Sequence, residues 1–215
     1  MKKFILPLLL ILTVGMLAAV ESEPSEVVGY VKYDCYTGFS YVAIPMGEGG
    51  NAEDLVSSNM PNITAIFKFV PSLQGWTSIE YDTEFQEWTD SMPVVPGDVL
   101  LLECTANTTF YSIGSLPTNY TYNITPGYNY LTVPVNRGNI QAAEQIGNEI
   151  GNINSIFRWL NISQGWESID YDSEFMEWTD TLPASIGDVF LLDSSGTAIW
   201  PTASKTINMK ISGKK

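Results

Sequence analysis

The chain has no histidine and only two cysteines among its 215 residues. Without histidine, the Ser-His-Asp and Cys-His arrangements of nucleophilic catalysis are excluded, and so are the common zinc sites. Two cysteines alone also provide too few ligands for a structural zinc site. Most hydrolase mechanisms are therefore ruled out for this protein.

Basic residues are scarce as well, because 10 Lys and Arg against 24 Asp and Glu give a formal net charge of −14. Binding to nucleic acid is dominated by attraction to phosphates, which a chain this acidic would repel. The same repulsion applies to an anionic membrane surface. We therefore expect no nucleic acid partner. The hydrophobic share of 45% with 12% aromatics is that of a folded protein.

Only one long hydrophobic run is present, at residues 4–20, and it follows the basic start Lys2-Lys3. The polarity changes directly after the run, at Glu21. This pattern is typical of a secretory signal peptide, which we place at residues 1–22. The alternative is a membrane anchor, since the run is near the lower length limit for spanning a bilayer. We expect a secreted protein, in the periplasm, at the cell surface or outside the cell, with no membrane span after signal cleavage.

The rest of the chain is organised around a stretch that occurs twice. Gly75 to Leu102 returns without a gap as Gly165 to Leu192, 90 residues later. Self-similarity of this length indicates one structural unit in two copies. We predict unit 1 at residues 23–115 and unit 2 at residues 116–204. A basic tail follows at residues 205–215, with four lysines and no acidic residue.

Each unit is predicted to be α+β and mainly β, a small antiparallel β-domain with one short helix. In unit 1, β-branched and aromatic residues predict strands at 27–33, 39–45, 65–69, 97–102 and 108–113. In unit 2, the equivalent patterns predict strands at 128–134, 155–159 and 187–192. A helix is predicted after Asn51 in unit 1 and after Asn139 in unit 2. The second helix has one apolar face, formed by Ile140, Ala143, Ile146 and Ile150.

Cys35 and Cys104 both lie in unit 1, and the equivalent positions in unit 2 are Ile124 and Ser194. The two cysteines are thus absent together from unit 2. In an oxidising compartment this predicts a disulfide between them. The alternative is a pair of unrelated buried thiols.

The order of the motifs resembles that of a known group of proteins. Each unit has a predicted strand followed by a short helix, an aromatic stretch and an apolar strand. The first strand is GFSYVAIP at residues 38–45 and GYNYLTVP at residues 127–134, and the apolar strand of unit 1 is PGDVLLL at residues 96–102. This pattern is similar to the tandem β-rich repeats of secreted bacterial and archaeal surface proteins, with segments close to G-x-N-L-V-S-L-P and P-G-x-x-Y-x-V. Asn129 matches the asparagine of that pattern, whereas Ser40 departs from it. The resemblance covers nearly all of the mature chain and implies a location at the surface more than an activity.

The repeated block combines aromatic and acidic residues. Tyr81, Phe85 and Trp88 are spaced i, i+4, i+7, so in a helix they would share one face while acidic residues point outward. The same spacing recurs in unit 2, at Tyr171, Phe175 and Trp178. The pattern predicts a packed aromatic face under a solvated acidic one.

Two other interpretations of the block are binding sites. Hard oxygen ligands suit calcium, although the spacing matches no calcium loop with its glycine bend, so we expect no cofactor and keep calcium as the alternative. The candidate ligands are Asp82, Glu84, Glu87, Asp172, Glu174 and Glu177. The aromatic residues could instead stack on sugar rings while carboxylates accept from hydroxyls, which requires exposed side chains. The candidate binding residues are Trp76, Trp88, Trp166, Trp178, Tyr81 and Tyr171.

No catalytic residue is predicted. Glu84 with Asp98 is the carboxylate pair that glycoside hydrolysis could use, but both recur, as Glu174 and Asp188. Duplicate catalytic sites in units this small are not expected. We expect a non-enzymatic protein with a structural or adhesive role, which contacts an envelope or extracellular protein or polysaccharide, or another copy of itself. The alternative is a carbohydrate-binding module, and a glycosidase-like enzyme is the third interpretation.

Overall fold

The computed structural model describes residues 28–47, 49–59, 62–116 and 120–201. Within these ranges the protein is mainly β, with antiparallel pairing throughout and two short α-helices. The predicted fold class, α+β and mainly β, is confirmed. The predicted signal peptide and basic tail lie outside the described residues.

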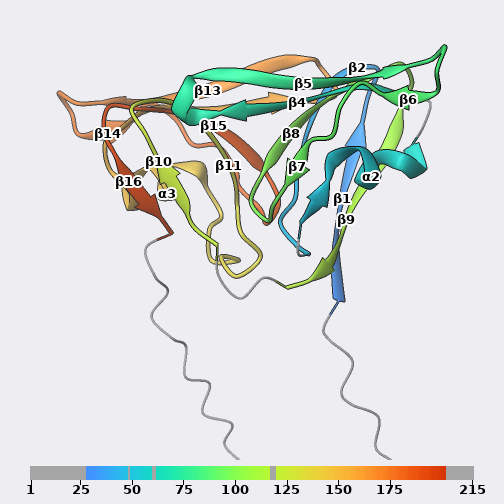
Figure 1. Ribbon diagram of the computed structural model, residues 1–215. Coiled ribbons are helices and arrows are strands. Elements are labelled where there is room, and N and C mark those ends of the chain that lie inside the picture. Colours follow the sequence, from blue (N-terminus) through green and yellow to red (C-terminus); the bar gives the residue numbers. More distant parts are fainter. Residues whose placement is uncertain (1–27, 48, 60–61, 117–119, 202–215) are drawn as a thin grey trace, which may run out of the picture.

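Unit 1 is built on a five-stranded antiparallel sheet (Figure 1). Its strand order is β2-β8-β4-β5-β6, with bounds Gly38–Ala43, Val99–Cys104, Ile63–Val70, Gly75–Asp82 and Glu87–Trp88. Two smaller sheets accompany it: β1 (Val28–Cys35) with β9 (Thr108–Ser115), and β3 (Gly50–Asn51) with β7 (Pro93–Val94). The helical segments are α2 (Ala52–Val56) and the 3-10 turns η1 (Ser57–Asn59) and η2 (Pro71–Leu73).

Unit 2 has a five-stranded sheet of equivalent order, β11-β15-β12-β13-β14. These strands span Gly127–Thr132, Val189–Ser194, Ile153–Leu160, Gly165–Asp172 and Glu177–Trp178. β10 (Tyr122–Ile124) pairs with β16 (Ala198–Trp200), and α3 spans Ala143–Ile150. The pairing register also agrees between the units: Phe69 lies opposite Trp76 in β4–β5, and Trp159 lies opposite Trp166 in β12–β13.

Each unit has its own hydrophobic core, on one face of its five-stranded sheet. Strand residues alternate between the two faces, so Leu100 and Leu102 of β8 enter the core of unit 1, whereas Leu101 packs on the opposite face. Phe110 in unit 1 and Trp200 in unit 2 occupy equivalent positions and are the largest fully buried side chains of their cores. The predicted apolar strands at 97–102 and 187–192 are therefore confirmed as buried, beginning two residues later than predicted.

The helices agree with the predicted apolar face but not with the predicted starts. Ile140, Ala143, Ile146 and Ile150 are all buried, yet α3 begins at Ala143. The Gln145 side chain accepts hydrogen bonds from the Gln141 and Ala142 backbone N–H groups just before the helix. Asn51 does precede α2, but its side chain makes no capping hydrogen bond.

The predicted helical arrangement of Tyr81, Phe85 and Trp88 is wrong. These residues lie in the β5–β6 hairpin, where Tyr81 is directly opposite Trp88. The Asp82 carboxylate accepts from the backbone N–H groups of Glu84 and Phe85, and this turn reverses the chain within four residues. Phe85 is consequently 70% exposed at the hairpin tip and does not share a face with Trp88. The unit 2 hairpin repeats this arrangement with Asp172 and Phe175.

The predicted disulfide is absent, because Cys35 and Cys104 are both free. Cys35 lies opposite Thr108 on β9, whereas Cys104 lies opposite Gly38 and Ile63 in the five-stranded sheet. The two cysteines therefore belong to different sheets and are not cross-strand partners. Both are buried in the core of unit 1. They are not unrelated thiols, because a side-chain hydrogen bond with Cys104 is the largest cause that raises the pKa of Cys35.

Candidate functional site

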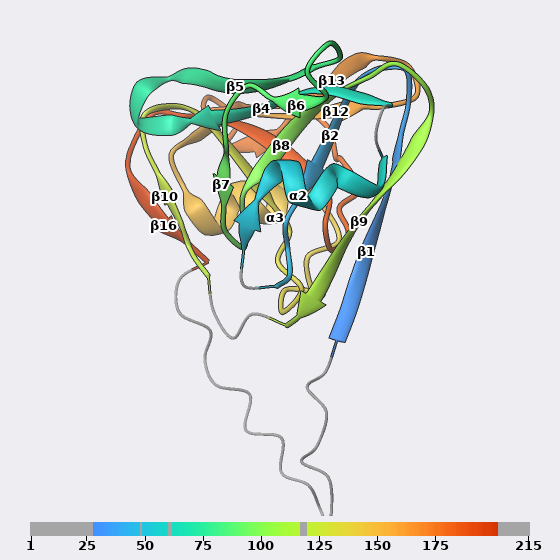
Figure 2. The same ribbon diagram turned by 45° about the vertical axis from the view of Figure 1, so that its right-hand side comes forward.

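The two units meet through the tips of their long hairpins. The β4–β5 hairpin of unit 1 extends toward unit 2, and the β12–β13 hairpin extends the opposite way (Figures 1 and 2). The Gln164 side chain accepts from the Phe39 backbone N–H (2.7 Å) and donates to the Phe39 carbonyl (2.8 Å). Gln74 makes the same two bonds to Tyr128, at 2.7 and 3.0 Å. Each glutamine thus pairs with the edge strand of the other unit's sheet and satisfies peptide groups that the sheet leaves open.

The local backbone explains why glutamine can reach across. Gln74 and Gln164 close the hairpin turns in the left-handed region, with φ of 47° and 51°. Each side-chain amide also donates back to its own turn, to the Pro71 carbonyl (2.8 Å) and the Asn161 carbonyl (2.6 Å). This second bond fixes the direction of the side chain toward the neighbouring unit. We refer to the reciprocal pair as the glutamine clamps.

A second reciprocal contact joins the turns before β8 and β15. The Tyr33 hydroxyl donates to the Gly187 carbonyl (3.0 Å), and the Tyr122 hydroxyl donates to the Gly97 carbonyl (3.0 Å). Gly97 and Gly187 have φ of +100° and +87°, and a Cβ atom on either would lie less than 3 Å from the other unit. Burial raises the pKa of both tyrosine hydroxyls well above the ordinary value, so both stay protonated and can donate. The repeated Gly-Asp turn is therefore part of the junction between the units.

Aromatic side chains from both units pack around this junction. The rings of Tyr41 and Tyr130 stack with centroids 5.3 Å apart, and their hydroxyls are 2.9 Å from each other. Trp76 packs against Tyr130 (5.3 Å) and Trp166 against Tyr41 (5.6 Å). Two further rings complete the set at equivalent positions, because Phe69 contacts Trp76 and Trp159 contacts Trp166. We call these six residues the junction band: Tyr41, Phe69, Trp76, Tyr130, Trp159 and Trp166.

The band is both anchored and accessible. Tyr41 is buried at its centre, whereas Trp76 and Trp166 are 42% and 44% exposed. The Trp159 indole N–H donates to the Phe39 carbonyl of unit 1 at 3.1 Å, which ties the band to the clamp. Burial raises the pKa of Tyr41 and Tyr130, so all six side chains are uncharged at neutral pH. The arrangement provides aromatic contact area with few polar groups, and it contains no acid or base for catalysis.

The structure divides the six predicted binding residues into three places. Trp76 and Trp166 lie in the junction band. Tyr81 with Trp88, and Tyr171 with Trp178, form edge-to-face pairs at the other ends of β5 and β13, at 5.6 and 5.4 Å. Trp88 and Trp178 are half-buried against the cores of their units, so they are neither fully exposed nor fully buried. A single platform of repeated tryptophans is therefore not formed.

The predicted calcium ligands do not assemble into a site. In the described parts of the chain, no group of three or more Asp, Glu or Cys side chains is placed to hold a metal ion. Asp82 and Asp172 use a carboxylate oxygen to hold their own turns. The four glutamates of these hairpins are exposed: Glu84, Glu87, Glu174 and Glu177. These acidic residues form solvated hairpin tips.

The carboxylate pair considered for glycoside hydrolysis is not brought together. Asp98 binds the Lys68 ammonium (2.8 Å) and the Val95 N–H (2.9 Å). Lys68 lies opposite Thr77 near the start of β5, whereas Glu84 lies beyond the far end of that strand. The two carboxylates are thus at opposite ends of the hairpin.

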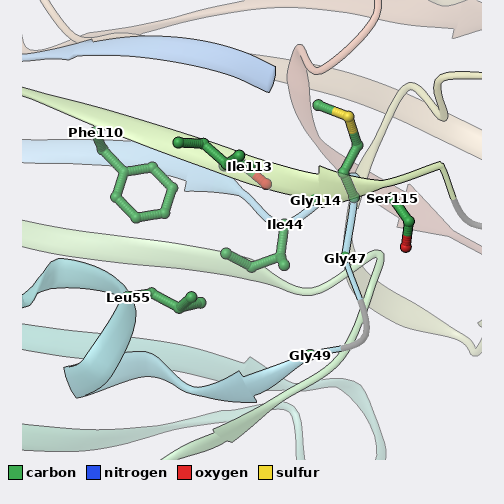
Figure 3. A pocket seen from close by; sticks show the side chains of 10 residues that line it. Ile44, Gly47, Gly49, Leu55, Phe110, Ile113, Gly114 and Ser115 are labelled. Atoms are coloured by element: carbon green, nitrogen blue, oxygen red, sulfur yellow. The ribbon is translucent and has the colours of Figure 1, made fainter. Parts of the chain in front are cut away.

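One cavity of about 250 Å³ lies in unit 1 between β9, the end of β2 and α2. Figure 3 shows Phe110, Ile44 and Leu55 around it, with Gly47, Gly49 and Gly114 at one side. The Ser112 hydroxyl is buried there without a hydrogen-bond partner among the described residues. The lining has no charged side chain, so the cavity offers apolar contact and two hydroxyls, those of Ser112 and Ser115.

Sequence reasoning missed most of the junction. Gln74 and Gln164 directly precede the repeated block, and Tyr41 and Tyr130 lie in the repeated strand before the helix. Their retention in both units was the available signal, but a repeat alone does not show which residues face the other copy. Which residues face the other copy depends on how the two units pack together.

Comparison with protein-family models, curated proteins and solved structures found no match to this chain. The resemblance to surface-protein repeats therefore stays a prediction. Neither helix within the described ranges is long and apolar enough to cross a membrane.

Proposed function

We propose that this is a secreted, non-enzymatic protein that adheres to an envelope or extracellular polymer through the junction band. The observation that carries the proposal is the pair Trp76 and Trp166, which are 42% and 44% exposed although each packs against two or more other rings. Large aromatic side chains that are rigidly held and still accessible are the residues that dominate binding surfaces.

The way the band is built supports a binding role. Both units contribute to it, so the surface exists only when the two units are packed together. Its rings are fixed by neighbours on both sides, so little side-chain entropy is lost on binding. The net charge of −14 would repel polyanions and leaves a neutral polysaccharide or an extracellular protein as partner. The absence of histidine and the separation of Glu84 from Asp98 support a role without catalysis.

The test is a pull-down of the mature protein on envelope fragments and insoluble polysaccharides. We expect retention of the native protein and a loss of about tenfold or more for Trp76→Ala/Trp166→Ala, checked for folding by circular dichroism. The matched control is Tyr30→Ser/Tyr111→Ser, which removes two aromatic rings, 68% and 47% exposed, from the β1–β9 sheet. Equal loss in both variants would show unspecific aromatic stickiness and would overturn the proposal.

A further inference from the structure

Unit 2 has a cavity of about 380 Å³ beside Trp178, separate from the junction band. The residues that shape it are Trp178, Tyr171, Asn148, Asn152, Asn154 and Ser195. They come from the β13–β14 hairpin, the end of α3, the start of β12 and the turn after β15. The cavity is within the size range of small-molecule sites.

The aromatic wall of the cavity is fixed in place. The Trp178 indole N–H donates to the Asn148 side-chain oxygen at 2.9 Å. The edge of the indole lies over Gly147, where an added Cβ would be 2.3 Å from a ring carbon, so only glycine fits. Tyr171 packs edge to face against the same ring, with centroids 5.4 Å apart. The half-buried indole is thus held from three sides while part of it faces the cavity.

Amide groups surround this aromatic wall. Asn148, Asn152 and Asn154 are all exposed, and each lines the cavity. The Asn148 oxygen binds Trp178 and the Asn154 amino group binds Asp193, whereas the Asn152 side chain makes no hydrogen bond with the described residues. Asn152 has φ of 55°, which places its backbone in the left-handed region two residues after the end of α3. Several donors and acceptors therefore remain free at the cavity.

All residues that line the cavity are uncharged at neutral pH, in a protein with a net charge of −14. An anionic ligand would meet a repulsive field and no counter-charge, and a cation would find no carboxylate in the lining. An aromatic ring beside free amides suits a ligand with an apolar C–H face and a rim of hydroxyls. We propose that the cavity binds one neutral pyranose ring of a saccharide, with Trp178 against the ring and the asparagine amides on its hydroxyls.

Unit 1 keeps the aromatic pair, as Tyr81 and Trp88, but several residues that line the unit 2 cavity are replaced. Ala52 and Ala143 make equivalent backbone bonds to Met92 and Leu182, which aligns the two helices. Val56 then stands where unit 2 has Gly147, and Ser57 where it has Asn148. Thr64 replaces Asn154. The Trp88 indole N–H makes no hydrogen bond within the described part of the chain, so the equivalent tryptophan is an internal control.

The test is an NMR titration of the full mature chain with methyl glycosides of glucose, galactose, mannose and N-acetylglucosamine. The probe is the indole N–H resonance of Trp178, assigned with Trp178→Phe. We expect at least one glycoside to shift this resonance saturably. Trp178→Ala and Asn152→Gly should weaken binding about tenfold or more, as measured by calorimetry. Glycine adopts the φ of Asn152 without strain, so the second variant removes the amide and keeps the fold.

The outcomes separate this site from the junction band. Trp88→Ala should leave the affinity unchanged, and Trp76→Ala/Trp166→Ala should leave it unchanged even if adhesion is lost. No shift with any glycoside up to about 50 mM, well above a millimolar Kd, would overturn the proposal. Unchanged affinity in Asn152→Gly, or equal loss in Trp88→Ala, would also overturn it, because binding would then not use this cavity.

Discussion

The two units share strand order and register, yet they differ in what surrounds their equivalent residues. The position of Phe110 in unit 1 is taken by Trp200 in unit 2, whose indole N–H donates to Glu149 at 2.8 Å. Arg137 binds the same carboxylate and lies 5.8 Å above the indole ring. Val56 of unit 1 is replaced by Gly147, which lies against the Trp178 indole and lines the unit 2 cavity. By contrast, the clamps are the same in both directions.

This difference shows which constraints act on a duplicated unit. The glutamines of the clamps and the stacked tyrosines are the same in both copies, because each clamp needs a partner edge strand of the same shape. Residues that line a unit's own core or rim can change separately when their neighbours in the same unit change with them, as Glu149 provides an acceptor for the Trp200 indole. The clamps are thus common to the two units, whereas the rims have diverged, and within the junction band Phe69 of unit 1 is replaced by Trp159 in unit 2.

The largest expected effect comes from removing the core rings. Phe110→Ala and Trp200→Ala should each lower the free energy of unfolding by about 3–5 kcal/mol, since both side chains are fully buried. Trp200→Phe isolates the extra contacts of unit 2 and should cost about 1 kcal/mol, because Glu149 loses its indole donor but keeps Arg137 and is partly exposed. Urea unfolding followed by circular dichroism measures all three. A Trp200→Phe variant as stable as the native protein would show that the Glu149 contact adds nothing.

Much of the fold was predictable, because alternating apolar and polar residues indicate a strand with one buried face, and continuous apolar runs indicate a buried strand. The strands at 97–102 and 187–192 are examples, and so is the apolar face of α3. The hairpin at residues 81–88 was mispredicted because Tyr81, Phe85 and Trp88 have helical spacing, while the structure is decided by the Asp82 side chain that caps a turn. A side chain that binds nearby backbone N–H groups can favour a turn over a helix, and the spacing of aromatic residues does not reveal this.

The candidate site was less predictable than the fold. Trp76 and Trp166 were named from the repeated aromatic block, but the sequence does not show that each packs against a tyrosine of the other unit. Gln74 and Gln164 were not named, since an exposed glutamine has no distinctive pattern in a sequence. The contact between Tyr41 and Tyr130 joins residues 89 apart in the chain, and only the relative placement of the units reveals it.

A smaller loss of stability is expected at the clamps, and it should be the same for Gln74 and Gln164 because their contacts are equivalent. Gln74→Ala and Gln164→Ala each remove a pair of hydrogen bonds to an edge strand and should each cost about 1–2 kcal/mol. The double variant should lose cooperativity between the units, so that tryptophan fluorescence and circular dichroism give separate unfolding midpoints. The control is Gln141→Ala, an exposed glutamine outside the junction. Coincident midpoints in the double variant would mean that the aromatic band alone couples the units.

The smallest effect concerns Asp188, whose equivalent in unit 1 is the ion-paired Asp98. Arg158 binds Glu167 and the Pro183 carbonyl, so among the described residues Asp188 has no ion-pair partner. Burial raises the pKa of Asp188 above its ordinary value, only partly offset by the Ser185 N–H and Arg158. The folded state therefore binds this proton more tightly than the unfolded state, and stability falls as the pH rises from about 4 through the raised pKa.

Glu167→Thr should remove the difference between Asp188 and the ion-paired Asp98. Thr77 is the equivalent of Glu167 in unit 1, and there Lys68 is free to pair with Asp98. With Glu167 gone, Arg158 can turn to Asp188, and the favoured charged form should lower the pKa of that carboxyl. We expect the decline in stability above pH 4 to become smaller by about 1 kcal/mol or less. Asp188→Asn should have the same effect, and it keeps the bond from the Ser185 N–H. Carbon-13 NMR titration of the Asp188 carboxyl measures the pKa directly. An unchanged pKa in Glu167→Thr would mean that Arg158 is held by Pro183, and that the two units differ here through the backbone and not through residue 167.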